Sequence, residues 1–476
     1  MEIYSSSVED QLIDGLSYKL AAGSSYITDR KSVTFYPSGS NIYTPVGGTK
    51  VLRFLINGSD WMDPNTLRIF FDLSNLENYP LRVLGNPYSF FRRMRVLVGN
   101  QLVEDIDQFN RVSYMFDTLR ARHVRENEDC EGFEDRFDQP EFQDILTNNS
   151  NNPAYPTTTD GRQMDNVANY YVSVKANGTK TVSFRPLSGL VSCGKLIPLQ
   201  YAPITIELEV CSDITDPIMS VDDVACNINS SGTGTANSGV KNNSQLWQIQ
   251  NPNVKCDVCV LDSALNNEYA SLLLSGKALP INISSYVMQM QTISGQTPSV
   301  NITRALSRLK SVFCTFDQAI SAAKYAVGTD THIRVWKKTW NDFFHPMSYS
   351  VSGHYDNAFE VETQLQIGSK LFPEYPVRSL QEQFYQLRKC MGTETSNFHS
   401  LDITPTQYRN HKFVAAFDTE KNLGSAFTGL NIKQGSLMTL KMRSTATSSQ
   451  MPDTVYLVLH FDSIVSITDS GVNVFE

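Results

Sequence analysis

One unit of sequence, a tight hairpin followed by an amphipathic helix, occurs twice in this chain of 476 residues. Gly99-Asn100 separates two apolar runs in the first copy, and Gly368-Ser369 does so in the second. Glycine at the first position of a two-residue loop is typical of a type II′ turn, because only glycine adopts positive φ there at little cost. We therefore predict that both pairs form type II′ hairpins.

An apolar stripe with helical spacing follows each hairpin. The stripes consist of Phe109, Val112, Phe116 and Leu119 in the first copy and of Val377, Leu380, Phe384 and Leu387 in the second. Both sets have the same intervals, which place their side chains on one face of a helix. A hairpin-and-helix unit that recurs about half a chain apart predicts two copies of one domain.

The remaining pattern is typical of antiparallel β-sheet. Leu67, Ile69, Phe71 and Leu73 alternate with more polar residues, and similar short runs are separated by turns rich in Gly and Asn. Charged residues make up only 19% of the chain, which is below the usual quarter. These features predict an all-β fold of two tandem β-sandwiches, each with a flanking α-helix and long loops.

We divide the chain into four parts. These are an N-terminal arm (1–28), a first sandwich (29–263), a connecting helix (264–279) and a second sandwich (280–476). Three polar inserts, at about 123–165, 213–246 and 317–360, are expected to project from one rim of the sandwiches. Burying them would leave backbone donors and acceptors without partners.

Composition argues against several classes of protein. The net charge is −9 and no block of Lys or Arg is present, so the chain lacks the basic face of a protein that coats nucleic acid. No run of 18 apolar residues and no signal peptide is found. We expect synthesis in the cytosol, a soluble product and eight cysteines that remain free thiols.

No residues have the spacing of a catalytic or metal site. Cys256 and Cys259 are three residues apart, and this odd spacing on a strand directs their thiols to opposite faces. Glu104 and Asp105 are adjacent, so they also point apart, and we interpret them as the entry to a helix rather than an acid–base pair. The seven histidines lack ligand spacing. We therefore predict no enzymatic activity, catalytic residue, cofactor or metal.

A small basic cluster is formed by Arg92, Arg93 and Arg95. It is too small to bind nucleic acid, but guanidinium groups pair well with carboxylates. We predict that these arginines lie at a contact between subunits.

Several segments resemble the major capsid proteins of polinton-like viruses and related adintovirus-type elements. They are YITDRKSVTFYP (26–37), WMDP (61–64), LRIFFD (67–72), PLRVLG (80–85), FFRR (90–93), GNQLVEDI (99–106), Asn110-Arg111 and, in the second half, IGSKLFPEYP (367–376). The resemblance implies a double jelly-roll fold, with eight strands in each of the two sandwiches and a flanking helix beside each.

The same resemblance implies a structural role in a virion. Members of that family form homotrimers whose six sandwiches approximate a hexagon, and these pseudo-hexameric capsomers tile an icosahedral shell around double-stranded DNA. The expected partners are further copies of the chain, neighbouring capsomers, a penton protein with a single jelly roll, and minor or cement capsid proteins. No specific binding to nucleic acid is expected.

Two alternatives are a duplicated β-sandwich that binds carbohydrate and a minor vertex protein. The first needs an aromatic platform or a carboxylate pair, for which Trp336 and Trp340 are the only hint. The second usually needs only one jelly roll. A size measurement separates most of these functions, because a trimer favours the capsid and a glycan-binding monomer favours the lectin-like protein.

Overall fold

We describe the fold from a computed structural model. The residues it describes are 26–76, 81–133, 174–175, 177–211, 217–221, 240–241, 246–317, 343, 360–393, 401–410, 412–420, 429–433, 437–444 and 452–476. Nearly all of the predicted arm, most of the three inserts, and Trp336 and Trp340 lie outside these residues.

The first half of the chain consists mainly of strands. They are β1 (Ile27–Phe35), β2 (Ile42–Tyr43), β3 (Val51–Ile56), β4 (Trp61–Asn75), β5 (Leu81–Val83), β6 (Phe91–Val98), β7 (Gln101–Ile106), β8 (Thr179–Phe184), β9 (Ile197–Pro198), β10 (Ile204–Val210), β11 (Ile218–Val221), β12 (Val240–Lys241) and β13 (Trp247–Leu261). The helices are η2 (Pro87–Phe90), α1 (Phe109–Thr118) and α2 (Arg122–Glu128), and α5 (Ser263–Leu274) leads to the second half.

The second half also consists mainly of strands with a few helices. Its strands are β14 (Leu279–Thr292), β15 (Ser299–Ile302), β16 (Leu309–Asp317), β17 (Val361–Ile367), β18 (Lys370–Val377), β19 (Ala415–Asp418), β20 (Met438–Ser444), β21 (Thr454–Thr468) and β22 (Gly471–Phe475). Its helices are α6 (Leu380–Cys390) and α7 (Pro405–Asn410).

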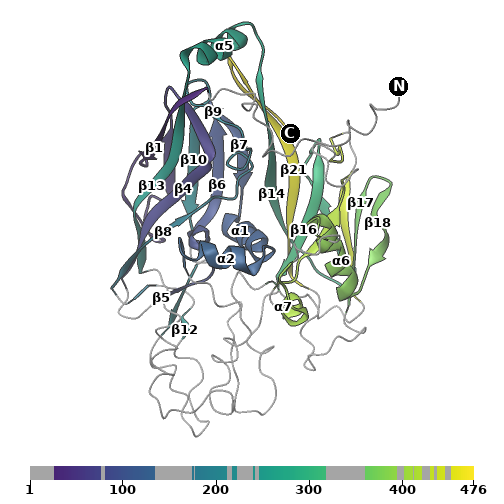
Figure 1. The fold of residues 1–476 in the computed structure, drawn as a ribbon. Helices are drawn as coiled ribbons and strands as arrows, with labels where there is room; N and C mark the ends of the chain where they lie inside the picture. The colour runs from purple at the N-terminus through teal and green to yellow at the C-terminus, as the bar shows by residue number, and fades with distance from the viewer. Residues whose placement is uncertain are drawn as a thin grey trace, which may run out of the picture.

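The strand order is the same in both halves. The main sheets of the first half have the orders β1-β13-β4-β8 and β3-β10-β6-β7, and those of the second half have the orders β14-β21-β16-β19 and β15-β20-β17-β18. The short strands β2 and β9 pair with the first of these sheets, β22 pairs with β21, and β5, β11 and β12 form a small separate sheet. If the eight strands of the two main sheets are numbered along the chain in each half, both halves give 1-8-3-6 and 2-7-4-5. This antiparallel order is that of a jelly roll, so the prediction of two tandem eight-stranded jelly rolls is confirmed (Figure 1).

Alternating side chains explain why each sandwich closes. In β3, Leu52, Phe54 and Ile56 are buried while Val51 and Leu55 on the opposite side are exposed. Such alternation buries one face of every sheet, and the two inner faces pack together.

Large aromatic side chains fill the first core. Phe71 makes edge-to-face contacts with Phe90 and Phe91, and Phe90 contacts the buried Trp247 on β13 with ring centroids 5.0 Å apart. Aromatic pairs at these distances add to the stabilisation that burial itself provides.

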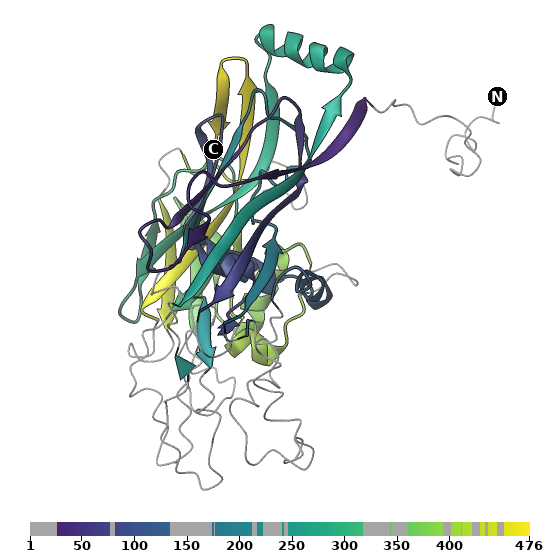
Figure 2. The same ribbon diagram turned by 90° about the vertical axis from the view of Figure 1, so that its left-hand side faces the viewer.

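The flanking helices occupy equivalent positions. Helix α1 follows β7 and α6 follows β18, each after the fifth strand of its jelly roll. Helix α5 lies at one end of the molecule (Figures 1 and 2) and is shorter than the predicted 264–279. It starts after the N-cap Asp262 and ends before Gly276, whose φ of 79° suits the left-handed conformation of a helix terminus.

The structure corrects the prediction for the start of the first insert. Residues 123–133 do not form a polar loop, because most of them belong to α2 (Arg122–Glu128) and the turn after it. The guanidinium of Arg120 donates two hydrogen bonds to Glu128, at 2.5 and 2.7 Å. The buried Phe133 packs against Phe90 in the core. Charge pairing and one aromatic anchor therefore attach this segment to the first jelly roll.

Candidate functional site: the junction between the two jelly rolls

The first repeated hairpin has the predicted loop length but a different turn type. Gly99 and Asn100 connect β6 to β7, and their φ angles are 55° and 66°. Two positive φ angles define a type I′ turn, so the predicted type II′ is wrong here. Asparagine tolerates the left-handed region because its short polar side chain can hydrogen-bond locally. At Gly368-Ser369 only the glycine has positive φ, 59°, as a type II′ turn requires.

The first apolar stripe lies on α1 and faces the interior. Phe109 and Val112 are buried in the helix, Leu119 is buried at its C-cap, and Phe116 is half-buried.

The second stripe begins one element earlier than predicted. Val377 is buried as the last residue of β18 and is not helical. The Ser379 hydroxyl accepts a hydrogen bond from the Glu382 backbone N–H at 3.2 Å, and the Glu382 carboxylate accepts one from the Ser379 N–H at 3.3 Å. This capping box starts α6 at Leu380. Phe384 and Leu387 then lie on the helix as predicted, half-buried and buried.

The predicted basic cluster lies on the outer face of the sheet β3-β10-β6-β7. Each of its three arginines faces a carboxylate of this same chain, a pairing that no local pattern in the sequence indicates. The N···O distances are 2.7 Å for Arg93–Asp105, 2.8 Å for Arg95–Glu207 and 4.0 Å for Arg92–Asp107. The side chains remain about 40% exposed, and their role in a subunit contact stays a prediction.

The turn at Gly99 packs directly against the second jelly roll. A Cβ atom on Gly99 would lie 2.9 Å from Cγ2 of Val472 in β22, closer than real Cβ contacts come. A second glycine, Gly189, lies so close to β14 that its Cβ would be 2.1 Å from the carbonyl oxygen of Ser284. Both glycines therefore allow the two jelly rolls to approach.

A buried carboxylate joins the two halves at this point. Glu104 in β7 accepts hydrogen bonds from the hydroxyl of Ser188, from the Gly189 N–H at 2.8 Å and from the Leu190 N–H at 3.4 Å. The hydroxyl of Ser285 in β14 donates a further bond of 2.7 Å from the second jelly roll. Burial raises the pKa of Glu104, while these donors act in the opposite direction.

Glu104 was predicted at a helix entry, and this interpretation is wrong. Its side chain points inward from a strand, while Asp105 points outward to Arg93, as the alternation of a strand requires.

A buried arginine from α1 forms the second polar link. Arg111 is only 4% exposed and reaches into the second jelly roll. Its Nε donates to Thr315 Oγ1 at 3.4 Å, Nη2 donates to the Phe316 carbonyl at 3.4 Å, and Nη1 lies 3.8 Å from Asp317 Oδ2. Its guanidinium also lies over the Tyr456 ring, 3.8 Å from the centroid. Hydrogen bonds and the ring face together compensate for the lost hydration of the cation.

Aromatic side chains complete the junction. Phe116 of α1 contacts Tyr286 of β14 and Phe313 of β16, with centroids 4.6 and 5.2 Å apart. Tyr286 in turn stacks on His460 of β21 at 4.9 Å and 17°. Burial, together with nearby Lys310, lowers the pKa of His460 to about 3, so this ring is neutral in the junction.

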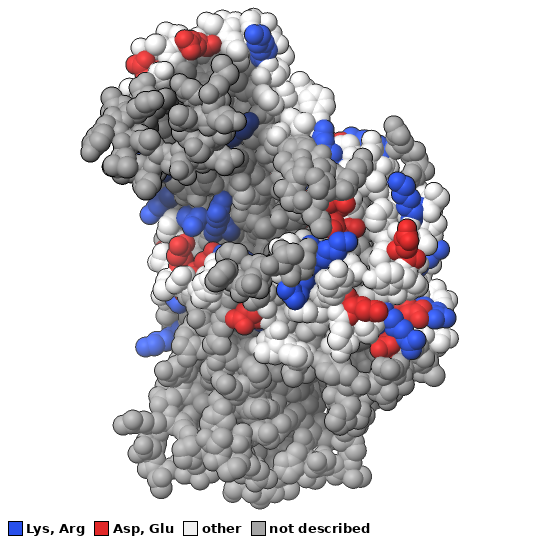
Figure 3. All heavy atoms as spheres, turned by 45° about the vertical axis from the view of Figure 1, so that its right-hand side comes forward, with Lys and Arg blue, Asp and Glu red and all other residues white. Residues whose placement is uncertain are grey.

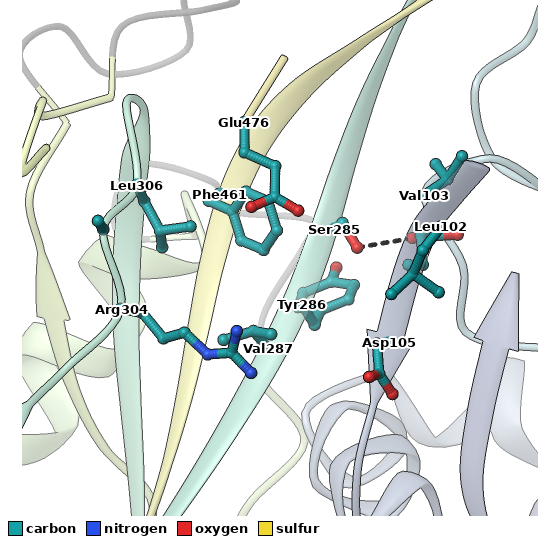
Figure 4. Close-up of a pocket in the computed structure, with 12 residues that line it drawn as sticks. Leu102, Val103, Asp105, Ser285, Tyr286, Val287, Arg304, Leu306, Phe461 and Glu476 are labelled. Atoms are coloured by element: carbon teal, nitrogen blue, oxygen red, sulfur yellow. Dashed lines mark hydrogen bonds between the residues drawn. The ribbon is translucent and has the colours of Figure 1, made fainter. Parts of the chain in front are cut away.

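A narrow cleft of about 150 Å³ remains at the edge of the junction. Figure 4 shows Leu102, Val103 and Asp105 of β7 on one side, with Arg304, Leu306, Phe461 and Glu476 across from them. Pockets for small organic ligands usually measure ~300–1,000 Å³. This cleft has room for a few water molecules and is part of the contact between the jelly rolls.

Other kinds of site find little support in the described part of the chain. No group of three His, Cys, Asp or Glu side chains there could bind a metal. Cys256 and Cys259 are buried free thiols in β13. Among the helices of the described residues, none is both long and apolar enough to cross a bilayer.

Comparison with solved structures identifies the fold class. The chain is similar to a structure from the Sputnik virophage (TM-score 0.57, 9% identity, covering 97% of this chain and 91% of that one) and to the Faustovirus major capsid protein (0.56, 9%, 97% and 94%). It is also similar to a chain of the PBCV-1 virus capsid (0.55, 12%, 96% and 99%). Scans of protein-family models and of curated proteins found no match. At such low identity the likeness establishes the fold, a double jelly roll.

We predict that Gly99→Val lowers the free energy of unfolding by about 1–3 kcal/mol, and Gly368→Val by a similar amount. Both positions have positive φ, and Gly99 also lacks room for a Cβ beside Val472. The control is Gly194→Val, because Gly194 has φ of 68° and open space at its Cβ position. Denaturant unfolding measures the difference. A cost at Gly99 no larger than at Gly194 would contradict the role of the close contact.

We predict that Arg111→Met lowers the free energy of unfolding by about 1.5–3 kcal/mol, because charge-assisted hydrogen bonds across the junction are lost. Arg92→Met is the control, since an exposed surface residue usually changes stability by less than ~0.5 kcal/mol. Equal effects of the two substitutions in denaturant unfolding would show that Arg111 does not hold the junction.

We predict that His460 makes the junction sensitive to acid. Its pKa of about 3 lies below the ordinary 6.5, so its contribution to stability is present above pH 6.5 and is lost as the pH falls toward 3. The loss is at most about 1.4 kcal/mol for each pH unit. Glu104 titrates in the opposite sense, so His460→Phe is compared with wild type by thermal unfolding at pH 7 and pH 4. The variant should lose less stability than wild type between these pH values, and an equal loss in both proteins would contradict this role of His460.

Proposed function

We propose that this chain is the major capsid protein of a virus with a double-stranded DNA genome. Three copies would form a pseudo-hexameric capsomer, and the capsomers would tile an icosahedral shell. The double jelly-roll fold supports this function, because similar solved structures include the Faustovirus major capsid protein and a chain of the PBCV-1 capsid.

The observation that carries the proposal is the junction inside the chain. The first jelly roll presents β7 and α1 to the second, which receives them on β14, β21 and β16. The second jelly roll has its own copy of the presenting unit, β18 and α6, and the first has its own copy of the receiving sheet. Contacts of this head-to-tail kind form a closed ring when the rotation from each unit to the next is a whole fraction of 360°. Three chains with two jelly rolls each give six such units.

The proposed partners follow from this arrangement. They are two further copies of the chain within the capsomer and neighbouring capsomers in the shell, with penton and cement proteins completing it. The proposed location is the virion shell. The carbohydrate-binding alternative depended on Trp336 and Trp340, which lie outside the described residues, and no described feature favours it.

We predict a trimer of this 53.4 kDa chain, with each contact larger than the standard protein interface of roughly 1,600 Å² in total. Light scattering on the purified chain at micromolar concentration measures the mass, and electron microscopy should show particles with a hexagonal outline. A stable monomer at that concentration would contradict the proposed capsomer.

A further inference from the structure

We propose that residues 8–20 form an amphipathic helix that docks on α5 of their own chain. These residues precede the described part of the chain, which starts at Tyr26 beside α5. The docking would brace the helix that links the two jelly rolls. Because it lies within one chain, it is independent of the proposed trimer.

Helix α5 has apolar side chains that are only partly covered. They are Ala264, Leu265, Tyr269, Ala270, Leu272, Leu273 and Leu274. Only Leu273 is buried, whereas Leu274 is 74% exposed. At the upper end of Figure 3, where α5 lies, uncharged side chains make up most of the described surface. A helix that is apolar on most sides is normally covered by its surroundings, so α5 lacks part of its cover.

One aromatic side chain holds α5 on the first jelly roll. Trp61 of β4 packs on Tyr269 with ring centroids 4.9 Å apart, and its Nε1 donates a hydrogen bond of 3.3 Å to Asn266 Oδ1. On the same side of the helix, Leu265 and Leu272 remain half-buried. A further apolar segment that packed beside this contact would remove more of both leucines from water, which is favourable.

Residues 8–20 carry an apolar stripe that suits this role. Val8, Leu12, Leu16 and Leu20 recur at every fourth position, and Ile13 lies on the same side of a helix. Glycine at position 15 weakens the helix, and isolated helices shorter than ~12–15 residues are marginal in water. The segment therefore needs an apolar partner to form a stable helix.

The connection to β1 brings the segment to α5. The N–H of Asp262, the N-cap of α5, donates a hydrogen bond of 2.7 Å to the Tyr26 carbonyl. Figure 2 shows the start of β1 near one end of α5 accordingly. The linker AAGSS (21–25) can span up to about 17 Å, which exceeds the ~8–10 Å between the axes of packed helices. The chain can therefore turn back and run antiparallel to α5.

Length and charge both fit the antiparallel arrangement. At 1.5 Å per residue, α5 and a helix over residues 8–20 are each about 18–20 Å long. Glu9 and Lys19 lie near the two ends of the stripe and on its side of the helix. Asp262 precedes α5, and the exposed Lys277 follows it. Antiparallel packing brings Glu9 to Lys277 and Lys19 to Asp262, so opposite charges meet at both ends.

The charge of the segment also favours a protein surface over a lipid surface. In residues 1–20, Glu2, Glu9, Asp10 and Asp14 outnumber Lys19. Helices that lie on anionic bilayers are rich in Lys and Arg on their polar side. The stripe therefore matches α5 better than it matches a membrane.

The first experiment compares two substitutions at adjacent positions in the full chain. Leu12→Asp places a charge in the stripe, and Gln11→Asp places the same charge on the polar side of the helix. Hydrogen exchange followed by mass spectrometry measures the backbone amides of residues 8–20 and of α5. We expect Leu12→Asp to accelerate exchange of both segments at least ten-fold, and Gln11→Asp to leave it unchanged. Equal exchange in wild type and Leu12→Asp would overturn the docking.

A charge exchange tests the antiparallel direction. Glu9→Lys and Lys277→Glu each bring like charges together, so each should accelerate the exchange of α5 about two- to five-fold, the range of an exposed ion pair. The double variant restores opposite charges and should return the exchange to the wild-type rate. A double variant that exchanges faster than either single variant would rule out this pairing of the two ends.

A crosslinking experiment identifies the chain that supplies the segment. The photoreactive p-benzoylphenylalanine replaces the exposed Leu274. After irradiation, crosslinks to residues 8–20 should migrate with the mass of one chain on a denaturing gel. Crosslinks that join two chains would overturn docking within the chain. Binding of wild type to vesicles of phosphatidylcholine and phosphatidylglycerol that is lost in Leu12→Asp would assign the stripe to a lipid surface instead.

The outcomes are separate from those of the proposed function. A wild type that is monomeric but shows the crosslink within one chain would overturn the capsomer and support the docking. A trimeric wild type without that crosslink, and with the same exchange in Leu12→Asp, would overturn the docking alone.

Discussion

Burial of two charged side chains between the jelly rolls is the constraint on which the rest of the molecule depends. A buried ion costs free energy unless hydrogen bonds and neighbouring charges replace its hydration. Glu104 and Arg111 both come from the first jelly roll, and each obtains part of its compensation from the second, through Ser285 and through Thr315 and Tyr456. Neither group is fully compensated until the jelly rolls dock in one orientation. The junction therefore fixes the angle between the two halves more strictly than apolar contact alone would.

Duplication of the fold did not preserve the chemistry of its surfaces. Both halves share strand order, hairpin and flanking helix, yet the offset of the stripes places Ser379 where Arg111 stands in the first copy. Ser379 serves instead as the N-cap of α6. The sheet that receives α1 is aromatic, whereas the equivalent sheet in the first jelly roll is charged. A permanent contact can be apolar, but a surface that is exposed to water until a partner binds has to be polar enough to remain hydrated.

The sequence was sufficient to predict the architecture and only part of the junction. The repeated hairpin and stripe led to two domains, because glycine at a tight turn and apolar residues at helical spacing are local signals. Glu104 was misplaced because its partners, Ser188 and Ser285, are far along the chain and give no local pattern. Val377 was assigned to a helix because its spacing fits, although the capping box at Ser379 marks the true start. Arg93 was predicted to lie at a contact between subunits. Its pairing with Asp105 within the chain depends on the register of β6 and β7, which places Asp105 opposite Arg95 and diagonal to Arg93.

The two repeated turns illustrate how one residue type is retained for different reasons. Gly99 and Gly368 share a left-handed φ, and this requirement is local to the hairpin. Gly99 has a second constraint, because Val472 lies against it across the junction. If the presenting unit of the second jelly roll docks as the first does, Gly368 should acquire the same constraint from a neighbouring chain. Its substitution would then weaken association between chains as well as the stability of its own hairpin, whereas Gly99 acts only within the chain.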